Sequence, residues 1–140
     1  MKFMILVSGQ EVRAGVLPDE KLLTEMGEFS EELVKAGVML AVEGLHPTSK
    51  GARVKFSGDK RTVTNGPFPE SNDLIAGFWI WQVTSKEDAI EWIKRAPFGE
   101  GAEIEIRQVF ETADFGEAMT PVLREQAERM AAKMAANAKR

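Results

Sequence analysis

Apolar residues recur with a period of two in several stretches of this chain, and this alternation predicts β-strands. Residues 3–7 form an unbroken apolar run, which is typical of a strand covered on both faces. Residues 77–83 form the most apolar strand candidate. Its alternation places Phe78 and Ile80 on one face and Trp79, Trp81 and Val83 on the other. Both faces of this strand therefore need cover.

Three other stretches repeat apolar residues every three or four positions and predict amphipathic helices. The first ends at Gly37, the second begins at a Ser85–Asp88 capping pair and stops at Pro97, and the third has Pro121 near its start. Their apolar positions are Leu22, Met26, Phe29 and Leu33; Ala89, Ile90, Ile93 and Ala96; and Met119, Val122, Leu123, Ala127, Met130 and Met134.

The order of these elements predicts an α+β fold. Residues 38–45 and 103–109 read as further strands, and residues 53–56 and 61–64 flank a Gly-Asp turn and predict a hairpin. We expect a ferredoxin-like, mostly antiparallel sheet with the helices on one face. Trp79 and Trp81 are expected on the uncovered face, where an apolar patch is typical of an interface or a ligand cleft. We therefore expect a homodimer with sheet packed near sheet.

The length of 140 residues fits one compact domain with an extension. We predict a domain over residues 1–110 and a C-terminal helical extension over residues 111–140. The apolar stripe of the extension is typical of a helix that packs on its own domain or across the dimer. The alternative is a Met-rich surface that binds a partner protein.

Composition excludes several classes of function. A net charge of −4 and a pI near 5.2 argue against nucleic-acid binding. The absence of cysteine excludes disulfides and thiolate metal ligands, and a single histidine excludes multi-histidine zinc sites within one chain. We expect no metal and no cofactor. The Gly99-Glu100-Gly101 stretch lacks the third glycine of a dinucleotide fingerprint and leads into a predicted strand, which argues against a Rossmann site. The N-terminal apolar run is too short for a signal peptide or a membrane span, so a cytoplasmic protein is expected.

His46 is the candidate for proton transfer, because imidazole has an ordinary pKa near neutrality. It follows the end of a predicted strand, and Glu43 lies three residues before it. If the chain bends between them, the Glu43 carboxylate can orient the imidazole ring as part of an acid/base pair. The alternative is a loop histidine with a surface hydrogen bond.

A ligand cleft between two subunits is the second candidate site. We expect it to be mostly apolar with a few polar anchors, as small-molecule sites usually are. The candidate ligand-binding residues are Arg53, Asn65, Phe68, Trp79, Trp81 and Arg107. The alternative is that the tryptophans pack a dimer core and that the charged side chains stay in water.

Several motifs together resemble the DGPF-motif branch of the YCII-related family. They are Asn65-Gly66-Pro67-Phe68-Pro69-Glu70, the strand from Leu74 to Val83, Glu43-Gly44-Leu45, Asp88 to Trp92 and the strand from Glu103 to Val109. The resemblance covers roughly Met1 to Val109 and implies a dimeric α+β barrel. Asn65 stands where the family pattern has Asp; it can keep the turn hydrogen bond but cannot transfer a proton. Asn72 stands where the family pattern has a lysine, and this weakens any hypothesis that an anionic substrate binds there.

The resemblance implies a function only in outline, because the family is largely uncharacterised. The first interpretation is a small-molecule-binding dimer, with possible enzyme activity that uses His46 as the acid or base. The second is a noncatalytic regulatory or accessory protein. DGPF-type members are often encoded beside alternative sigma factors, so the resemblance implies a partner in such a system. The acidic charge then favours contact with protein.

Overall fold

The structure is a computed structural model that describes residues 1–8, 19–69, 74–99 and 102–139. Its internal contacts divide the chain into two compact units, Met1–Val109 and Phe110–Arg140. The first unit contains an antiparallel sheet, its helices and a hairpin. The second unit contains the C-terminal helix. Each unit is described by itself.

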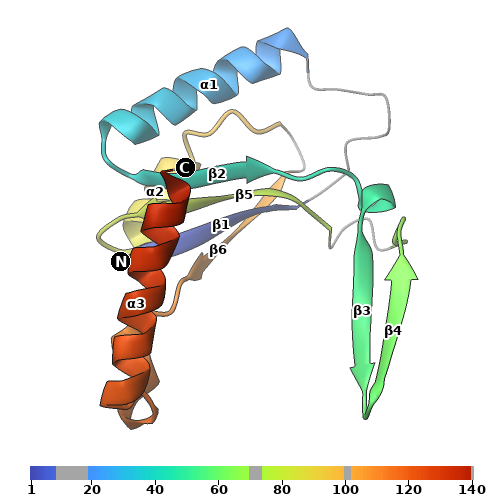
Figure 1. Cartoon of the computed structure of the whole chain (residues 1–140). Helices are drawn as coiled ribbons and strands as arrows, with labels where there is room; N and C mark the ends of the chain where they lie inside the picture. Colours follow the sequence, from blue (N-terminus) through green and yellow to red (C-terminus); the bar gives the residue numbers. More distant parts are fainter. Residues whose placement is uncertain (9–18, 70–73, 100–101, 140) are drawn as a thin grey trace. The chain divides into compact units, whose positions relative to one another are not determined.

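A four-stranded antiparallel sheet forms the centre of the first unit (Figure 1). Its strands are β1 (Lys2–Ser8), β2 (Met39–Gly44), β5 (Ile75–Gln82) and β6 (Glu103–Gln108), in the spatial order β2-β5-β1-β6. Helices α1 (Glu20–Lys35) and α2 (Lys86–Ile93) connect them. Apart from the hairpin, the order along the chain is βαββαβ, the order of a ferredoxin-like unit. The predicted α+β fold with an antiparallel sheet is confirmed.

Local chemistry favours the start of both helices and the end of α1. The Asp19 carboxylate accepts a hydrogen bond from the Leu22 amide (2.8 Å) at the start of α1. Gly37, just beyond the end of α1, has a φ of 72°, which glycine adopts without strain. The Ser85 hydroxyl accepts a hydrogen bond from the Asp88 amide (3.1 Å) and caps α2, as the sequence predicts.

The hydrophobic core lies between the helices and one face of the sheet. Trp79 and Trp81 are buried there, with exposed fractions of 2% and 0%. The Phe29 ring of α1 contacts both indoles edge-on, at centroid distances of 6.0 and 6.3 Å. The prediction that these tryptophans lie on the uncovered face is wrong. Strand β5 is apolar on both faces, so its alternation separates the two sets of side chains without showing which set the helices cover.

The opposite face of the sheet, here called the open face, carries the other set of alternating residues. The strand register places Met4 opposite Ile80 and Leu6 opposite Phe78, and these four side chains are partly buried. Neither α1 nor α2 lies on this face (Figure 1). Within the first unit, the open face is therefore an apolar surface that α1 and α2 leave uncovered.

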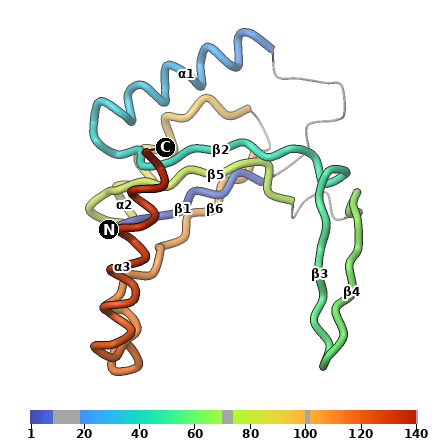
Figure 2. Tube along the Cα trace, in the orientation of Figure 1, coloured from blue at the N-terminus to red at the C-terminus, as the bar shows by residue number. Residues whose placement is uncertain are grey.

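The predicted hairpin is present as a separate two-stranded sheet of β3 (Ala52–Ser57) and β4 (Lys60–Asn65). It follows the short 3-10 turn η1 (Thr48–Lys50) and runs away from the main sheet on the side opposite α1 (Figures 1 and 2). Two hydrogen bonds fix its base: Gly66 N–H to the Gly51 carbonyl (3.0 Å) and Phe68 N–H to Thr48 Oγ1 (3.1 Å).

The second unit consists of a 3-10 segment, η2 (Thr112–Ala118), and the helix α3 (Pro121–Ala138). The Phe110 and Phe115 rings stack at a centroid distance of 5.0 Å. The Thr120 hydroxyl caps α3 by accepting a hydrogen bond from the Leu123 amide (3.3 Å). Within the described part of the chain, no helix has both the length and the apolar character needed to cross a membrane.

Candidate functional site

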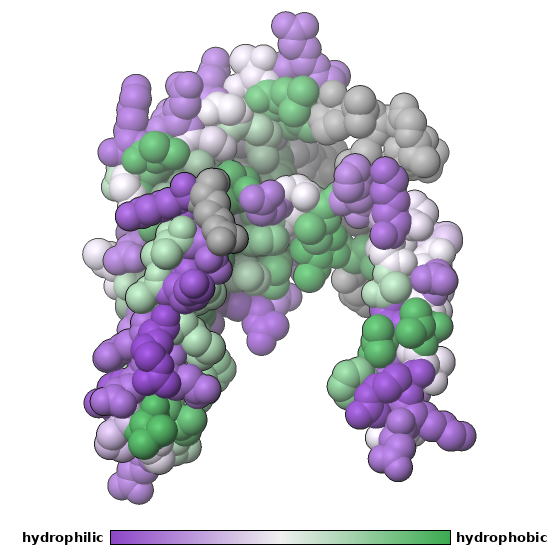
Figure 3. Space-filling view, viewed as in Figure 1, coloured by the Kyte–Doolittle hydropathy of each residue, from purple (hydrophilic) through white to green (hydrophobic). Residues whose placement is uncertain are grey.

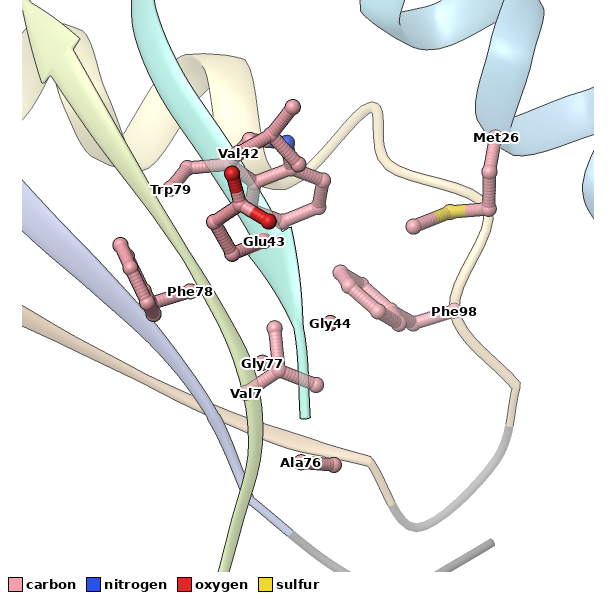
Figure 4. A pocket seen from close by; sticks show the side chains of 10 residues that line it. All are labelled: Val7, Met26, Val42, Glu43, Gly44, Ala76, Gly77, Phe78, Trp79 and Phe98. Atoms are coloured by element: carbon pink, nitrogen blue, oxygen red, sulfur yellow. The ribbon is translucent and has the colours of Figure 1, made fainter. Parts of the chain in front are cut away.

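A pocket of about 200 Å³ opens between α1 and the helix-facing side of the sheet (Figure 4). Elements far apart in the sequence build its walls. The lining comes from Val7 of β1, Met26 of α1, residues 42–44 of β2, residues 76–79 of β5, and Phe98 after α2. The pocket therefore exists only when the whole first unit is folded.

Two glycines opposite each other form part of the pocket wall. Gly44 of β2 pairs with Gly77 of β5 in the strand register. A β-carbon at residue 77 would stand 2.9 Å from the Glu43 carbonyl oxygen, whereas a β-carbon at residue 44 would meet no atom within 4 Å. Two missing side chains next to the bulky Trp79 leave a hollow on this face. Gly77 is required for the close approach of β2, and Gly44 leaves open space.

The pocket walls are mainly apolar and aromatic. The Phe98 ring meets the Trp79 ring edge-on at a centroid distance of 5.9 Å, and Figure 4 shows Met26 beside Phe98. Among the described lining residues only Glu43 carries a charge, and its pairing with Phe78 places its exposed side chain on the open-face side of β2. Such walls favour a small apolar ligand.

The indole nitrogens of Trp79 and Trp81 are buried without a hydrogen-bond partner within the described structure. An unpaired buried N–H typically costs about 1–3 kcal/mol. Both rings lie in an aromatic cluster, at 5.5 Å from each other and near Phe29. The tryptophans are retained here for their large apolar surface rather than for a hydrogen bond.

The predicted pair of Glu43 and His46 is not assembled. His46 lies in the loop between β2 and η1, is exposed, and is absent from the pocket lining. Among the described residues, the hydrogen bonds and ion pairs include none between His46 and Glu43. The role of His46 as an acid or base stays a prediction.

The remaining candidate ligand-binding residues occupy other places. The Arg53 guanidinium lies over the Phe68 ring, 3.9 Å from its centroid, at the base of the hairpin. Asn65 ends β4 opposite Ala52 and is exposed. The structure thus brings Arg53 and Phe68 together, but none of these three residues lines the pocket.

Arg107 lies on the open face, on the other side of the sheet from the tryptophans. The register pairs it with Met4, whereas Trp81 pairs with Phe3, and adjacent strand residues point to opposite faces. Its Nε atom lies 3.7 Å from Glu105 Oε2, and both side chains are exposed. The prediction that Trp79, Trp81 and Arg107 share one cleft face is wrong, because the sheet separates them.

Several pocket residues were not among the predicted site residues, namely Met26, Gly44, Gly77 and Phe98. The available signal was the glycines, because glycine within a strand often marks a close approach of backbone or ligand. Met26 and Phe98 could not be recognised from spacing alone, since their roles depend on how α1 and the loop after α2 pack. Over the described residues, no group of three or more His, Cys, Asp or Glu side chains could hold a metal ion.

Comparison with protein families matches residues 1–113 to the YCII-related domain. The chain belongs to the YCII-related family. This confirms the family resemblance, while the assignment to the DGPF branch stays a prediction. The YCII-related match covers the whole sheet and both of its helices.

The YCII-related chain is also similar to an uncharacterized protein of Rhizobium meliloti (strain 1021). The two are 26% identical over 76 residues, which is 54% of this chain and 61% of that protein. The match thus spans about three-fifths of the relative's length. That relative carries no assigned activity, so the arrangement of residues in the pocket has to support any proposal of function.

Proposed function

We propose that this protein binds a small, largely apolar molecule in the pocket beneath α1 and acts as a homodimer. The observation that carries the proposal is the pocket itself, which combines aromatic walls with the empty space at Gly44. At about 200 Å³ it is smaller than the roughly 300–1,000 Å³ pockets of drug-sized ligands. A molecule with a single aromatic ring is therefore the ligand class that we expect.

Glu43 contributes to the pocket wall near its main chain, because it pairs with Phe78 and its exposed side chain therefore lies on the open-face side of β2. In this proposal the ligand ring contacts Met26, Trp79 and Phe98. A charged ligand is disfavoured, because apolar walls cannot replace the water around a charge.

The homodimer is proposed from the open face of the sheet. Met4, Leu6, Phe78 and Ile80 form an apolar patch on that face, which the helices of the first unit leave uncovered. Apolar patches of this kind usually mark interfaces. Packing two open faces together covers both patches and creates the dimeric α+β barrel that the sequence resemblance implies.

A thermal-shift experiment tests the proposed pocket. The purified protein is screened with indole, phenol, benzylamine and benzoate at millimolar concentrations. A ligand that binds only the folded state raises Tm, by an amount equivalent to about 2.7 kcal/mol at one hundred times Kd. We expect a neutral compound, indole or phenol, to raise Tm, and the charged benzylamine and benzoate to have weaker effects.

The matched variant for this experiment is Gly44→Val, because the added side chain points into the pocket without meeting the backbone. Gly27→Ala on α1 is the control, since its added methyl also meets no atom within 4 Å and residue 27 is exposed. The ligand should stabilise the native protein and Gly27→Ala but not Gly44→Val. Equal stabilisation of all three, or of none, would refute the pocket.

Enzyme activity is a separate part of the proposal. His46 follows Gly44 of the pocket wall by two residues, in the loop after β2. If the ligand reacts there with His46 as the acid or base, His46→Ala should abolish turnover and leave the ligand-induced rise in Tm unchanged. Turnover that persists in His46→Ala excludes this role.

A noncatalytic accessory role is the second candidate, and α3 is the observation that favours it. Val122, Leu123, Met130 and Met134 are exposed in the second unit. Such a helix can bind a partner protein, for example in the sigma-factor system that the DGPF resemblance implies. Met130→Asp together with Met134→Asp should then abolish binding of that partner and leave small-molecule binding intact. Partner binding that survives both substitutions excludes α3 as the contact surface.

A further inference from the structure

The β3–β4 hairpin has an apolar face that its own sheet leaves uncovered. Val54 pairs with Val63, and Phe56 pairs with Arg61, so their side chains share one face of the hairpin. The exposed fractions of Val54, Val63 and Phe56 are 55%, 61% and 70%. Figure 3 shows the corresponding apolar surface on the hairpin. A two-stranded hairpin alone is only marginally stable in water, so this face needs a partner.

Charge indicates what kind of partner the hairpin fits. Residues 52–65 carry four basic side chains, Arg53, Lys55, Lys60 and Arg61, and one acidic side chain, Asp59. In contrast, α1 and its cap carry six acidic residues and two basic ones, although the whole chain has a net charge of only −4. The basic hairpin and the acidic helix of a second copy are complementary.

The direction and length of the hairpin fit the same partner. The hairpin runs from the sheet on the side of the open face, opposite α1 (Figure 1). Each of its strands has six residues, or roughly 20 Å at about 3.3 Å per residue. A second sheet packed on the open face lies about 10 Å away, so the hairpin extends past it towards the partner's helices.

We propose that the β3–β4 hairpin is an arm that embraces a second copy of this chain. Val54, Phe56 and Val63 pack against the partner, and the basic residues Lys60 and Arg61 beside the turn lie near the acidic α1 of the partner. The proposal rests on the homodimer proposed above and adds a surface to it. In a two-fold dimer each copy gives one arm and receives one, so both hairpins are covered.

Sedimentation equilibrium of the full chain tests the arm through Phe56→Asp. Phe56 is highly exposed and lies outside the hydrophobic core, so this variant should keep its fold, which circular dichroism verifies. Thr62→Asp is the control on the opposite face of the same hairpin. We expect Phe56→Asp to raise the dimer Kd at least tenfold and Thr62→Asp to change it less than threefold. An unchanged Kd in Phe56→Asp would overturn the proposal.

A second variant separates the arm from the open face. Ile80→Asp places a charge on the open face and should also dissociate the dimer. If Ile80→Asp dissociates it and Phe56→Asp does not, the dimer stands and the arm is refuted. If the native chain is a monomer at 100 μM, both the proposed dimer and the arm are refuted, whereas ligand binding in the pocket is tested separately.

Cross-linking locates the tip of the arm. Because the chain has no cysteine, Asp59→Cys provides a single attachment point for a benzophenone maleimide at the hairpin turn. The benzophenone-carrying protein is mixed with ¹⁵N-labelled native protein, the subunits are allowed to exchange, and the mixture is irradiated. We expect cross-links to ¹⁵N peptides that contain residues 20–35. Cross-links confined to peptides of the benzophenone-carrying chain would overturn the proposal.

Discussion

The α-carbon of Gly66 lies against the main chain of Thr48, so closely that a β-carbon at residue 66 would overlap the Thr48 carbonyl oxygen. This contact closes the base of the hairpin, together with the hydrogen bond from Gly66 N–H to the Gly51 carbonyl. Glycine is required here by close approach of two backbones rather than by a positive φ. The Gly-Pro loop thus has a structural role that requires no chemistry from Asn65.

Gly66→Ala should therefore separate η1 from the loop after β4. Backbone cannot move aside as a flexible side chain can, so we expect a loss of about 1–3 kcal/mol in the free energy of unfolding. Urea denaturation measures it. Gly51→Ala is the matched control, because its β-carbon would stand 3.6 Å from the same carbonyl oxygen, an ordinary contact. Equal losses in both variants would contradict this explanation.

Trp81 is predicted to contribute to stability and not to ligand contact. It is fully buried against Phe29 and does not line the pocket, whereas Trp79 does. Trp81→Ala should lower the free energy of unfolding by about 3–5 kcal/mol, the usual cost of removing a buried aromatic ring. Trp92→Ala should cost less, because Trp92 is only partly buried. Denaturation followed by circular dichroism compares them, and a loss below 1 kcal/mol for Trp81→Ala would refute its place in the core.

Much of the fold could be predicted from the sequence because its elements have strong local signals. The Gly-Asp turn between two short strands identifies the hairpin, and Ser85 identifies the start of α2. The side of the sheet that the helices cover has no such signal. Phe78 and Trp79 are both large and apolar, and only the packing of Phe29 against Trp79 and Trp81 decides between the faces.

The candidate site could be predicted less well for the same reason. The predicted ligand-binding residues were chosen by residue type, and the structure distributes them over the core, the hairpin base and the open face. The pocket depends instead on small residues, Gly44 and Gly77, and on Met26 and Phe98, which approach it only through tertiary packing. No spacing rule along the chain relates these positions.

Gly27 offers a stabilising substitution on α1. It lies in the interior of the helix, is exposed, and an added β-carbon would meet no atom within 4 Å. Alanine restricts the unfolded chain more than glycine does, so Gly27→Ala should raise the free energy of unfolding by about 0.5–1 kcal/mol. Thermal and urea denaturation check this gain. A decrease would show that residue 27 has a contact in solution, for example with a second copy.

The first unit is predicted to fold without α3. The residues of the hydrophobic core lie between Phe3 and Ala89, and the partly buried residues that pack on them extend only to Ile106. A chain that ends at residue 110 should therefore unfold cooperatively, with a Tm within about 8 °C of the full chain, which corresponds to roughly 1 kcal/mol for a domain of this size. An 18-residue helix without a core is marginal in water, so a peptide of residues 110–140 should be largely unfolded. Circular dichroism of the two pieces tests both expectations. A shortened chain that aggregates would show instead that the exposed apolar residues of α3 cover the first unit in solution, and it would remove the support for α3 as a surface for a partner protein.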